Sequence, residues 1–98
     1  MIIRIVKLSF APENITTFLD VFERTKEKIR GREGCTHLEL LNDINSPNIY
    51  FTYSHWKEER FLEDYRNSDL FKTVWAETKV LFNDKPQAWS VKSIDNVK

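Results

Sequence analysis

The stretch that decides the fold is NIYFTYSHWKEERFLEDYRNSDLFKTVW, from Asn48 to Trp75. Its first residues are mostly β-branched or aromatic and alternate in character, which predicts a strand over Asn48–His55. The next residues, Lys57–Tyr65, place their apolar side chains at helical spacing. Asn67-Ser68 interrupts this helix, and Ser68 is a suitable N-cap for a second helical segment.

Large rings are concentrated in this stretch, which holds eight of the thirteen Phe, Tyr and Trp residues of the chain. Rings of this size need either a core or a ligand to cover them. We therefore expect the stretch to build much of any pocket. The candidate substrate-binding residues are Tyr50, Tyr53, Trp56, Phe71 and Trp75.

The segments on either side complete the pattern of a small α+β domain. Alternating residues predict strands, and apolar residues at spacings of three, four and seven predict an amphipathic helix that ends at the Gly31–Gly34 turn. The predicted order is strand, helix, strand, strand, helix, strand, which is ferredoxin-like, with an antiparallel sheet and both helices on one face. The flanking elements are a strand over Ile2–Phe10, a helix over Pro12–Arg30, and strands over Cys35–Asn42 and Ala88–Ile94.

The uncovered face of the sheet is also expected to carry apolar and aromatic side chains. Such a face needs a cover. A second copy of the chain, packed face to face, is the simplest cover, so we expect a homodimer.

The length and composition of the chain limit its possible domain organisation, binding partners and location. The 98 residues suit a single domain spanning 1–98. A formal net charge of zero argues against nucleic-acid binding, and no apolar run is long enough to span a membrane. One cysteine, Cys35, and no secretion signal at the first residues predict a cytoplasmic location. Two histidines without a third ligand make a poor metal site.

Three segments resemble the antibiotic biosynthesis monooxygenase (ABM) domain family of the dimeric α+β barrel superfamily. They are Gly34-Cys35 at the start of the second strand, Phe51–Trp56 at the end of the third, and Tyr65-Arg66-Asn67-Ser68-Asp69-Leu70-Phe71 in the broken helix. The similarity extends from the first strand to Trp89. It implies a homodimeric barrel with a pocket between sheet and helices in each subunit. Some members of the family are similar to oxygenases that use no cofactor and act on quinols or anthrone-like phenols. Other members degrade haem.

The haem-degrading branch of the family can be compared residue by residue. That branch uses an Asn on the first strand, a Trp in the second helix and a haem-ligating His ten residues later. Here Tyr65 stands at the Trp position, Trp75 follows ten residues later, and the first strand has no Asn. An indole cannot ligate iron, so the resemblance disfavours haem degradation. Quinol-type members often carry a His at the position of Tyr65.

Oxygenation without a cofactor requires a base, a donor for the substrate anion and a dry aromatic pocket. His37 and His55 are candidate bases, and Tyr50, Tyr53 and Tyr65 are candidate donors. Arg66 could hold an acidic group of the substrate, but a solvated side chain is the simpler explanation. We assign His37 and Tyr65 as the candidate catalytic residues. His37 has an equally good structural explanation, because it lies in mid-strand and can pair with neighbouring polar groups. Trp56 has a similar alternative as a core ring.

Two functions are therefore compatible with the sequence. One is a cofactor-independent monooxygenase that oxidises a small aromatic phenol or quinol. The other is a non-catalytic binding or stress-response module that sequesters an apolar small molecule in the same dimeric barrel. A base beside the pocket would favour the enzyme, whereas a pocket lined only by rings and aliphatic groups would favour binding.

Overall fold

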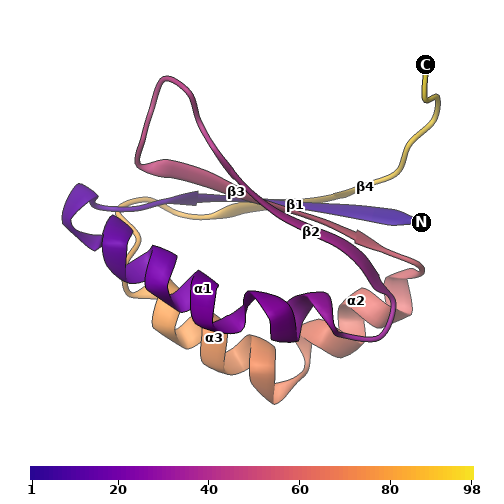
Figure 1. Ribbon diagram of the computed structural model, residues 1–98, viewed down its shortest axis with the longest axis horizontal. Helices are drawn as coiled ribbons and strands as arrows, with labels where there is room; N and C mark the ends of the chain where they lie inside the picture. The colour runs from indigo at the N-terminus through magenta and orange to yellow at the C-terminus, as the bar shows by residue number, and fades with distance from the viewer.

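The computed structural model describes residues 1–98 as a four-stranded antiparallel sheet with all the helices on one face (Figure 1). The strand order is β2-β3-β1-β4, with β1 and β3 in the centre. This is the α+β, ferredoxin-like arrangement that the sequence predicts. The elements are β1 (Ile2–Ser9), a 3-10 turn (Pro12–Asn14), α1 (Ile15–Arg30), β2 (Cys35–Asn42), β3 (Ile49–Trp56), α2 (Glu59–Arg66), α3 (Asp69–Lys79) and β4 (Gln87–Val91).

The register of the sheet determines which side chains face the helices. Val6 of β1 lies opposite Thr52 of β3 and Ala88 of β4, and these three residues belong to the helix-facing side. Because side chains alternate along a strand, the neighbouring residues of each strand point to the outer face. Each central strand therefore contributes both to the helix-side cavity and to the uncovered surface.

Two clusters of buried side chains lie between the sheet and the helices. The larger one contains Leu8, Phe10, Phe18, Tyr50 and Leu81. The smaller one contains Cys35, Trp56 and Leu62. Members of both clusters line one cavity, so the interior of the domain is not filled continuously.

A β-bulge between Cys35 and His37 interrupts the regular alternation of side chains along β2. Simple alternation would place both side chains on the same face, but the register shifts between them. Cys35 is consequently buried against Trp56 and Leu62, whereas His37 points outward. The inserted residue of a bulge changes the direction of the side chains that follow it.

The last strand is shorter than the predicted Ala88–Ile94, because its pairing with β1 covers only Gln87–Val91. The third strand begins at Ile49 and includes Trp56, whose backbone pairs with both Ile2 and Cys35. These differences move element ends by a few residues and leave the topology unchanged.

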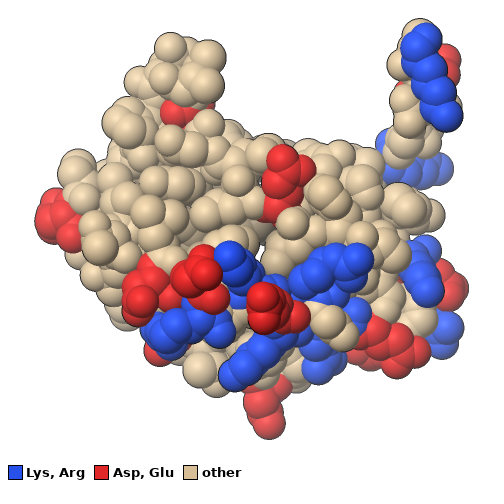
Figure 2. Space-filling model, viewed as in Figure 1, with Lys and Arg blue, Asp and Glu red and all other residues tan.

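The outer face of the sheet is largely uncharged. In Figure 2 the charged side chains gather over the helices, and the surface on the sheet side is mostly free of them. Leu41 and Trp89 on this face are 38% and 44% exposed. The connection between β2 and β3 and the C-terminal tail both project from the sheet on the side away from the helices (Figure 1). No helix has the length and apolar character needed to cross a membrane.

Candidate active site

A cavity of about 360 Å³ lies between the sheet and the helices. Residues from all four strands and all three α-helices line it, and most of these residues are hydrophobic. Its volume falls at the lower end of the roughly 300–1,000 Å³ typical of small-molecule sites. The cavity is therefore suited to a small, mainly apolar ligand.

The break between α2 and α3 positions two aromatic rings of the cavity wall. The hydroxyl of Ser68 accepts a hydrogen bond from the backbone N–H of Phe71 at 3.1 Å, as an N-cap does. The same hydroxyl donates to the backbone carbonyl of Tyr65. Ser68 thereby joins the end of α2 to the start of α3. The rings of Tyr65 and Phe71 meet edge to face, with centroids 5.3 Å apart.

Stacked rings extend along the wall from this junction. Tyr65 stacks on Trp56 with a centroid distance of 5.3 Å and an interplanar angle of 21°. Phe71 stacks on Trp75 at 5.9 Å with an angle of 9°. Four of the predicted site residues, Trp56, Tyr65, Phe71 and Trp75, are thus brought together on one cavity. Flat rings of this kind suit a planar aromatic ligand.

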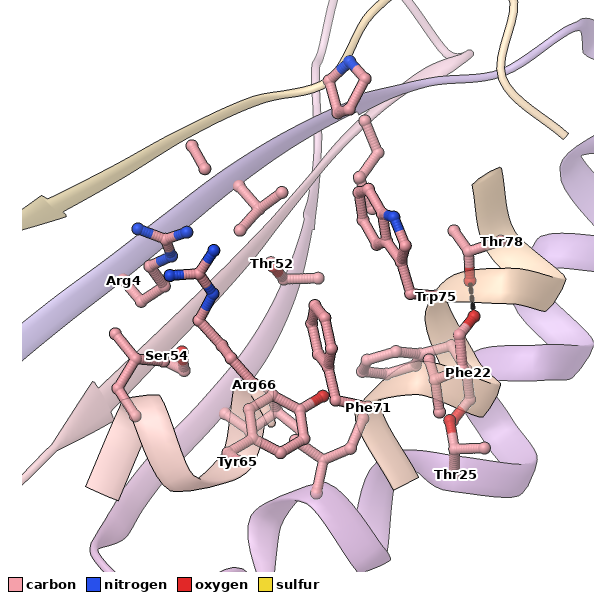
Figure 3. A pocket seen from close by; sticks show the side chains of 18 of the residues that line it. Arg4, Phe22, Thr25, Thr52, Ser54, Tyr65, Arg66, Phe71, Trp75 and Thr78 are labelled. Atoms are coloured by element: carbon pink, nitrogen blue, oxygen red, sulfur yellow. Dashed lines mark hydrogen bonds between the residues drawn. The ribbon is translucent and has the colours of Figure 1, made fainter. Parts of the chain in front are cut away.

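The hydroxyl of Tyr65 points into the cavity, toward Phe71 (Figure 3). It forms no hydrogen bond within the chain, although polar groups in such places usually have a partner. Burial raises the pKa of Tyr65 to about 12. Tyr65 is therefore a neutral phenol at ordinary pH, and it has a proton available to donate to a ligand.

Most of the other polar groups in the lining already have partners. The indole N–H of Trp56 donates to the hydroxyl of Ser54 at 3.0 Å. The hydroxyls of Thr25 and Thr78 donate to carbonyls of their own helices, at 2.8 and 2.7 Å. No carboxylate or imidazole side chain lines the cavity. The wall itself therefore supplies no group that would act as a general base near neutral pH.

The other predicted site residues do not line this cavity. His37 and Tyr53 lie on the outer face of the sheet, where the two rings meet edge to face with centroids 5.9 Å apart. The Nε2 atom of His37 is 2.9 Å from a carboxylate oxygen of Glu39. Tyr50 is buried in the larger cluster with Phe10 and Phe18. The structure therefore does not bring His37 to Tyr65 within one chain.

His55 shares the outer face with His37, at a centroid distance of 5.0 Å. Its Nε2 atom is buried and has no hydrogen-bond partner within the chain. Burial and the neighbouring His37 lower the pKa of His55 below its usual range. Both histidines thus belong to the surface where a partner is expected, and neither belongs to the cavity.

The cavity residues do not fit a haem group. Trp75, at the position of the haem-ligating His, stacks on Phe71 and meets the edge of Phe82. No histidine, cysteine or methionine lines the cavity. Tyr65 is the one remaining side chain of a type that ligates haem iron, and its raised pKa disfavours the phenolate that a metal requires. The chain also has no cluster of three His, Cys, Asp or Glu side chains suited to a metal ion.

Two arginines also line the cavity: Arg66, which the sequence offered as a partner for an acidic substrate group or as a solvated side chain, and Arg4, which the sequence analysis did not assign to a site. Arg4 reaches the cavity from β1 and Arg66 from the end of α2 (Figure 3). The sequence contained a signal for Arg4, because this residue shares a strand face with the apolar residues Ile2, Val6 and Leu8. A charged side chain on an apolar face is a reason to suspect a special role.

The model of one protein family, described as antibiotic biosynthesis monooxygenase, matches residues 1–77. This chain belongs to that family. The matched region contains every residue that we have described in the cavity wall except Thr78 and those of β4 and the segment before it. No curated protein matches the sequence at a significant level.

Solved structures share the ABM fold over almost their full lengths. One is a crystal structure of an antibiotic biosynthesis monooxygenase, with 17% identity, a TM-score of 0.90, and coverage of 97% of this chain and 100% of the other. A conserved protein from Methanosarcina mazei Go1 has 22% identity and a TM-score of 0.88, over 94% and 92% of the two chains. A protein from Mycobacterium tuberculosis has 12% identity and a TM-score of 0.89, over 99% and 98%. At these identities the likeness concerns the fold alone.

Proposed function

We propose that this ABM-family protein is a cofactor-independent monooxygenase that oxidises a small aromatic phenol or quinol with dioxygen. The observation that carries the proposal is the unpartnered hydroxyl of Tyr65 in a cavity walled by stacked rings. The family description and the size of the cavity support it. For an anthrone-type substrate, the ring methylene and one dioxygen molecule would give a ring carbonyl and one water.

Tyr65 would act as the hydrogen-bond donor to the substrate oxygen. Loss of the phenolic proton gives an anion that is rich enough in electrons to reduce dioxygen. A donor aimed at the place where this negative charge develops stabilises the anion more strongly than the neutral phenol. The raised pKa of Tyr65 suits this role, because the side chain keeps its own proton while the substrate loses one.

Water would accept the proton of the substrate. The cavity lining has no carboxylate or imidazole, and His37, the base expected from the sequence, lies on the outer face of the sheet. The exposed side chain of Arg66 lines one end of the cavity, which gives solvent a route to that end. This assignment predicts that His37→Ala leaves oxygen consumption unchanged.

We also propose that the protein is a homodimer whose sheets pack through their outer faces. This face carries exposed Leu41, Trp89 and Val91 with few charges around them. The segment between β2 and β3 projects beyond the same face and carries Ile44, which is 95% exposed. Static light scattering at micromolar concentration should give twice the mass of one chain, and Trp89→Asp should shift the mass toward one chain. A wild-type mass of one chain would contradict the dimer.

The test of the enzymatic proposal is oxygen consumption by the purified, metal-free protein with a series of quinols and anthrones. We expect uptake above autoxidation that falls about tenfold or more in Tyr65→Phe, because a hydrogen bond to a charged group is lost. Tyr53→Phe is the matched control, since it removes the same hydroxyl from the outer face. Equal loss in both variants, or uptake unaffected by Tyr65→Phe, would contradict the role of Tyr65.

Non-catalytic binding of a small aromatic molecule is the second candidate. The absence of a carboxylate or imidazole from the cavity lining favours it. In that case the same compounds would quench the fluorescence of Trp56 and Trp75 in a saturable way, with no oxygen uptake above autoxidation.

A further inference from the structure

Arg4 and Arg66 are the only charged residues that line the cavity. Their guanidinium groups lie together at one end of it, and Arg66 reaches from α2 toward the sheet (Figure 3). The positive charge of Arg66 acts on Arg4, so the two groups are close enough to repel each other. An arrangement of this kind favours an anion between the two groups.

Arg4 has no carboxylate partner within the chain. It is half-buried on the helix-facing side of β1, and its one side-chain hydrogen bond goes to the neutral hydroxyl of Ser90 at 2.9 Å. Burial and the nearby Arg66 lower the pKa of Arg4 from its ordinary value. A charged group partly withdrawn from water is normally paired with an opposite charge. The carboxylate of Glu63 attracts Arg4 but forms its ion pair with Arg66.

Arg66 has a partner, but that partner balances only one of the two arginines. A carboxylate oxygen of Glu63 lies 3.2 Å from the guanidinium of Arg66, and both side chains are about half exposed. Glu63 does not line the cavity. Two guanidinium groups and one carboxylate leave one uncompensated positive charge at the end of an otherwise apolar space.

We propose that the cavity selects a planar aromatic acid, whose carboxylate lies between Arg4 and Arg66 and whose ring lies against Phe71 and Trp75. The inference rests on the proposed function, because it names the substrate class of the same cavity. Guanidinium groups match the two oxygens of a carboxylate, and such charge-assisted bonds are stronger than neutral ones. The stacked rings supply the apolar surface that the rest of the ligand requires.

The position of Tyr65 indicates a second polar group on the proposed ligand. Its hydroxyl points toward Phe71 and the middle of the cavity, whereas the two guanidinium groups lie at one end (Figure 3). A hydroxyl-bearing aromatic acid would satisfy both groups at once, with its carboxylate on the arginines and its phenolic oxygen on Tyr65. The arginines would then orient the ring, and Tyr65 would touch the oxygen that loses its proton.

The test compares the binding of 2-naphthoate and 2-naphthamide, which differ in the charge of one substituent. Titration calorimetry of the wild-type protein should show at least about tenfold tighter binding of the acid. Arg4→Gln and Arg66→Gln should each remove most of this preference while changing the binding of the amide little. Arg60→Gln is the matched control, because Arg60 is exposed, contacts Phe61 and Glu58, and does not line the cavity.

Equal affinity for the acid and the amide in the wild-type protein would overturn the proposal. A preference for the acid that persists in both cavity variants would overturn it as well. If Arg4→Gln does not fold, Arg4→Lys together with Arg66→Gln tests the same point, since lysine retains the charge but loses the paired geometry. Under the proposal, the Arg4→Lys variant binds the acid more weakly than the wild-type protein does. The same variant still binds the acid more tightly than it binds the amide.

The binding result is separate from the oxygenase test. A preference for the acid without oxygen uptake would support the anion site and contradict the enzymatic proposal. Oxygen uptake with neutral quinols, in a protein that does not distinguish the acid from the amide, would support the enzyme and contradict the anion site.

Discussion

The ring of Tyr65 lies nearly parallel to that of Trp56, at a centroid distance of 5.3 Å. The two differ in how their polar atoms are satisfied. Trp56 is almost fully buried and donates its indole N–H to Ser54, whereas the hydroxyl of Tyr65 has no partner within the chain. The polar atom of Trp56 thus contributes to the fold, and the polar atom of Tyr65 is free for a ligand.

The first prediction is that Tyr65→Phe does not weaken the fold. The change removes a partly buried hydroxyl that makes no hydrogen bond. The free energy of unfolding should therefore stay within about 0.5 kcal/mol of the wild-type value or exceed it by up to about 1 kcal/mol. Urea denaturation measures it. Trp56→Phe should instead lower the value by about 2 kcal/mol, through the lost hydrogen bond and the smaller ring. A loss above about 1.5 kcal/mol in Tyr65→Phe would show that its hydroxyl has a structural partner.

The second prediction concerns pH. An ordinary tyrosine titrates near about pH 10, and burial raises the pKa of Tyr65 in the folded chain to about 12. The folded state therefore holds this proton where the unfolded state has lost it. The free energy of unfolding should fall as pH rises from about 10 through about 12, and this contribution should be absent from Tyr65→Phe.

Ultraviolet absorbance of tyrosinate measures the same ionisation directly. The difference between the titration curves of the wild-type protein and Tyr65→Phe isolates Tyr65 from the other two tyrosines. We expect a midpoint near pH 12. A midpoint close to pH 10 would mean that water reaches the Tyr65 hydroxyl freely.

The third prediction is that Gly34→Ala is strongly destabilising. Gly34 has φ of +84°, and a Cβ added there would lie 2.2 Å from Cγ and 2.4 Å from Cβ of Phe61. A left-handed conformation costs an L-residue about 1–2 kcal/mol, and forced overpacking adds about 1–3 kcal/mol. We expect a total loss of roughly 2–5 kcal/mol in urea denaturation.

Gly31→Ala is the matched control for this substitution. Gly31 has a negative φ, and its added Cβ would approach no atom closer than 3.2 Å. Its effect should stay below about 1 kcal/mol. Equal losses for the two variants would mean that the contact with Phe61 adjusts without cost.

The fourth prediction concerns the junction of α2 and α3. Ser68→Ala removes the cap of the Phe71 N–H and the bond to the Tyr65 carbonyl, and should cost about 1 kcal/mol of unfolding free energy. Because Ser68 lies between two rings of the cavity wall, the variant should also bind aromatic ligands more weakly. Ser68→Asp keeps a capping oxygen and should be more stable than the alanine variant. If the two variants unfold at the same urea concentration, the cap is not what holds the junction.

Most of the fold could be predicted from the sequence, because its signals are local. Alternation in the strands and helical spacing gave the element order, and Cys35–Asn42 begins and ends where it was predicted. The capping role of Ser68 is also confirmed. The bulge after Cys35 could not be predicted, since it depends on pairing with β3 and leaves no local mark in the sequence.

The cavity was predicted in part. Trp56, Tyr65, Phe71 and Trp75 share one wall because all four lie in the stretch that forms β3 and the broken helix. Tyr50 and Tyr53 are in the same strand, but one belongs to the core and the other to the outer face. The pairing of Arg4 with Arg66 joins residues far apart in the chain, so it became visible only through the three-dimensional arrangement.

The hydroxyls of Thr25 and Thr78 have a consequence for the hydration of the cavity. Each has already given its single proton to a backbone carbonyl, so this part of the wall offers water few hydrogen-bond donors. The part of the cavity near these threonines is therefore less hydrated than the end that holds Arg4 and Arg66, and apolar spaces admit inert gases such as xenon. Dioxygen, itself a small apolar gas, should therefore partition into the cavity from solution, and would be stored beside the bound ring before any electron moves.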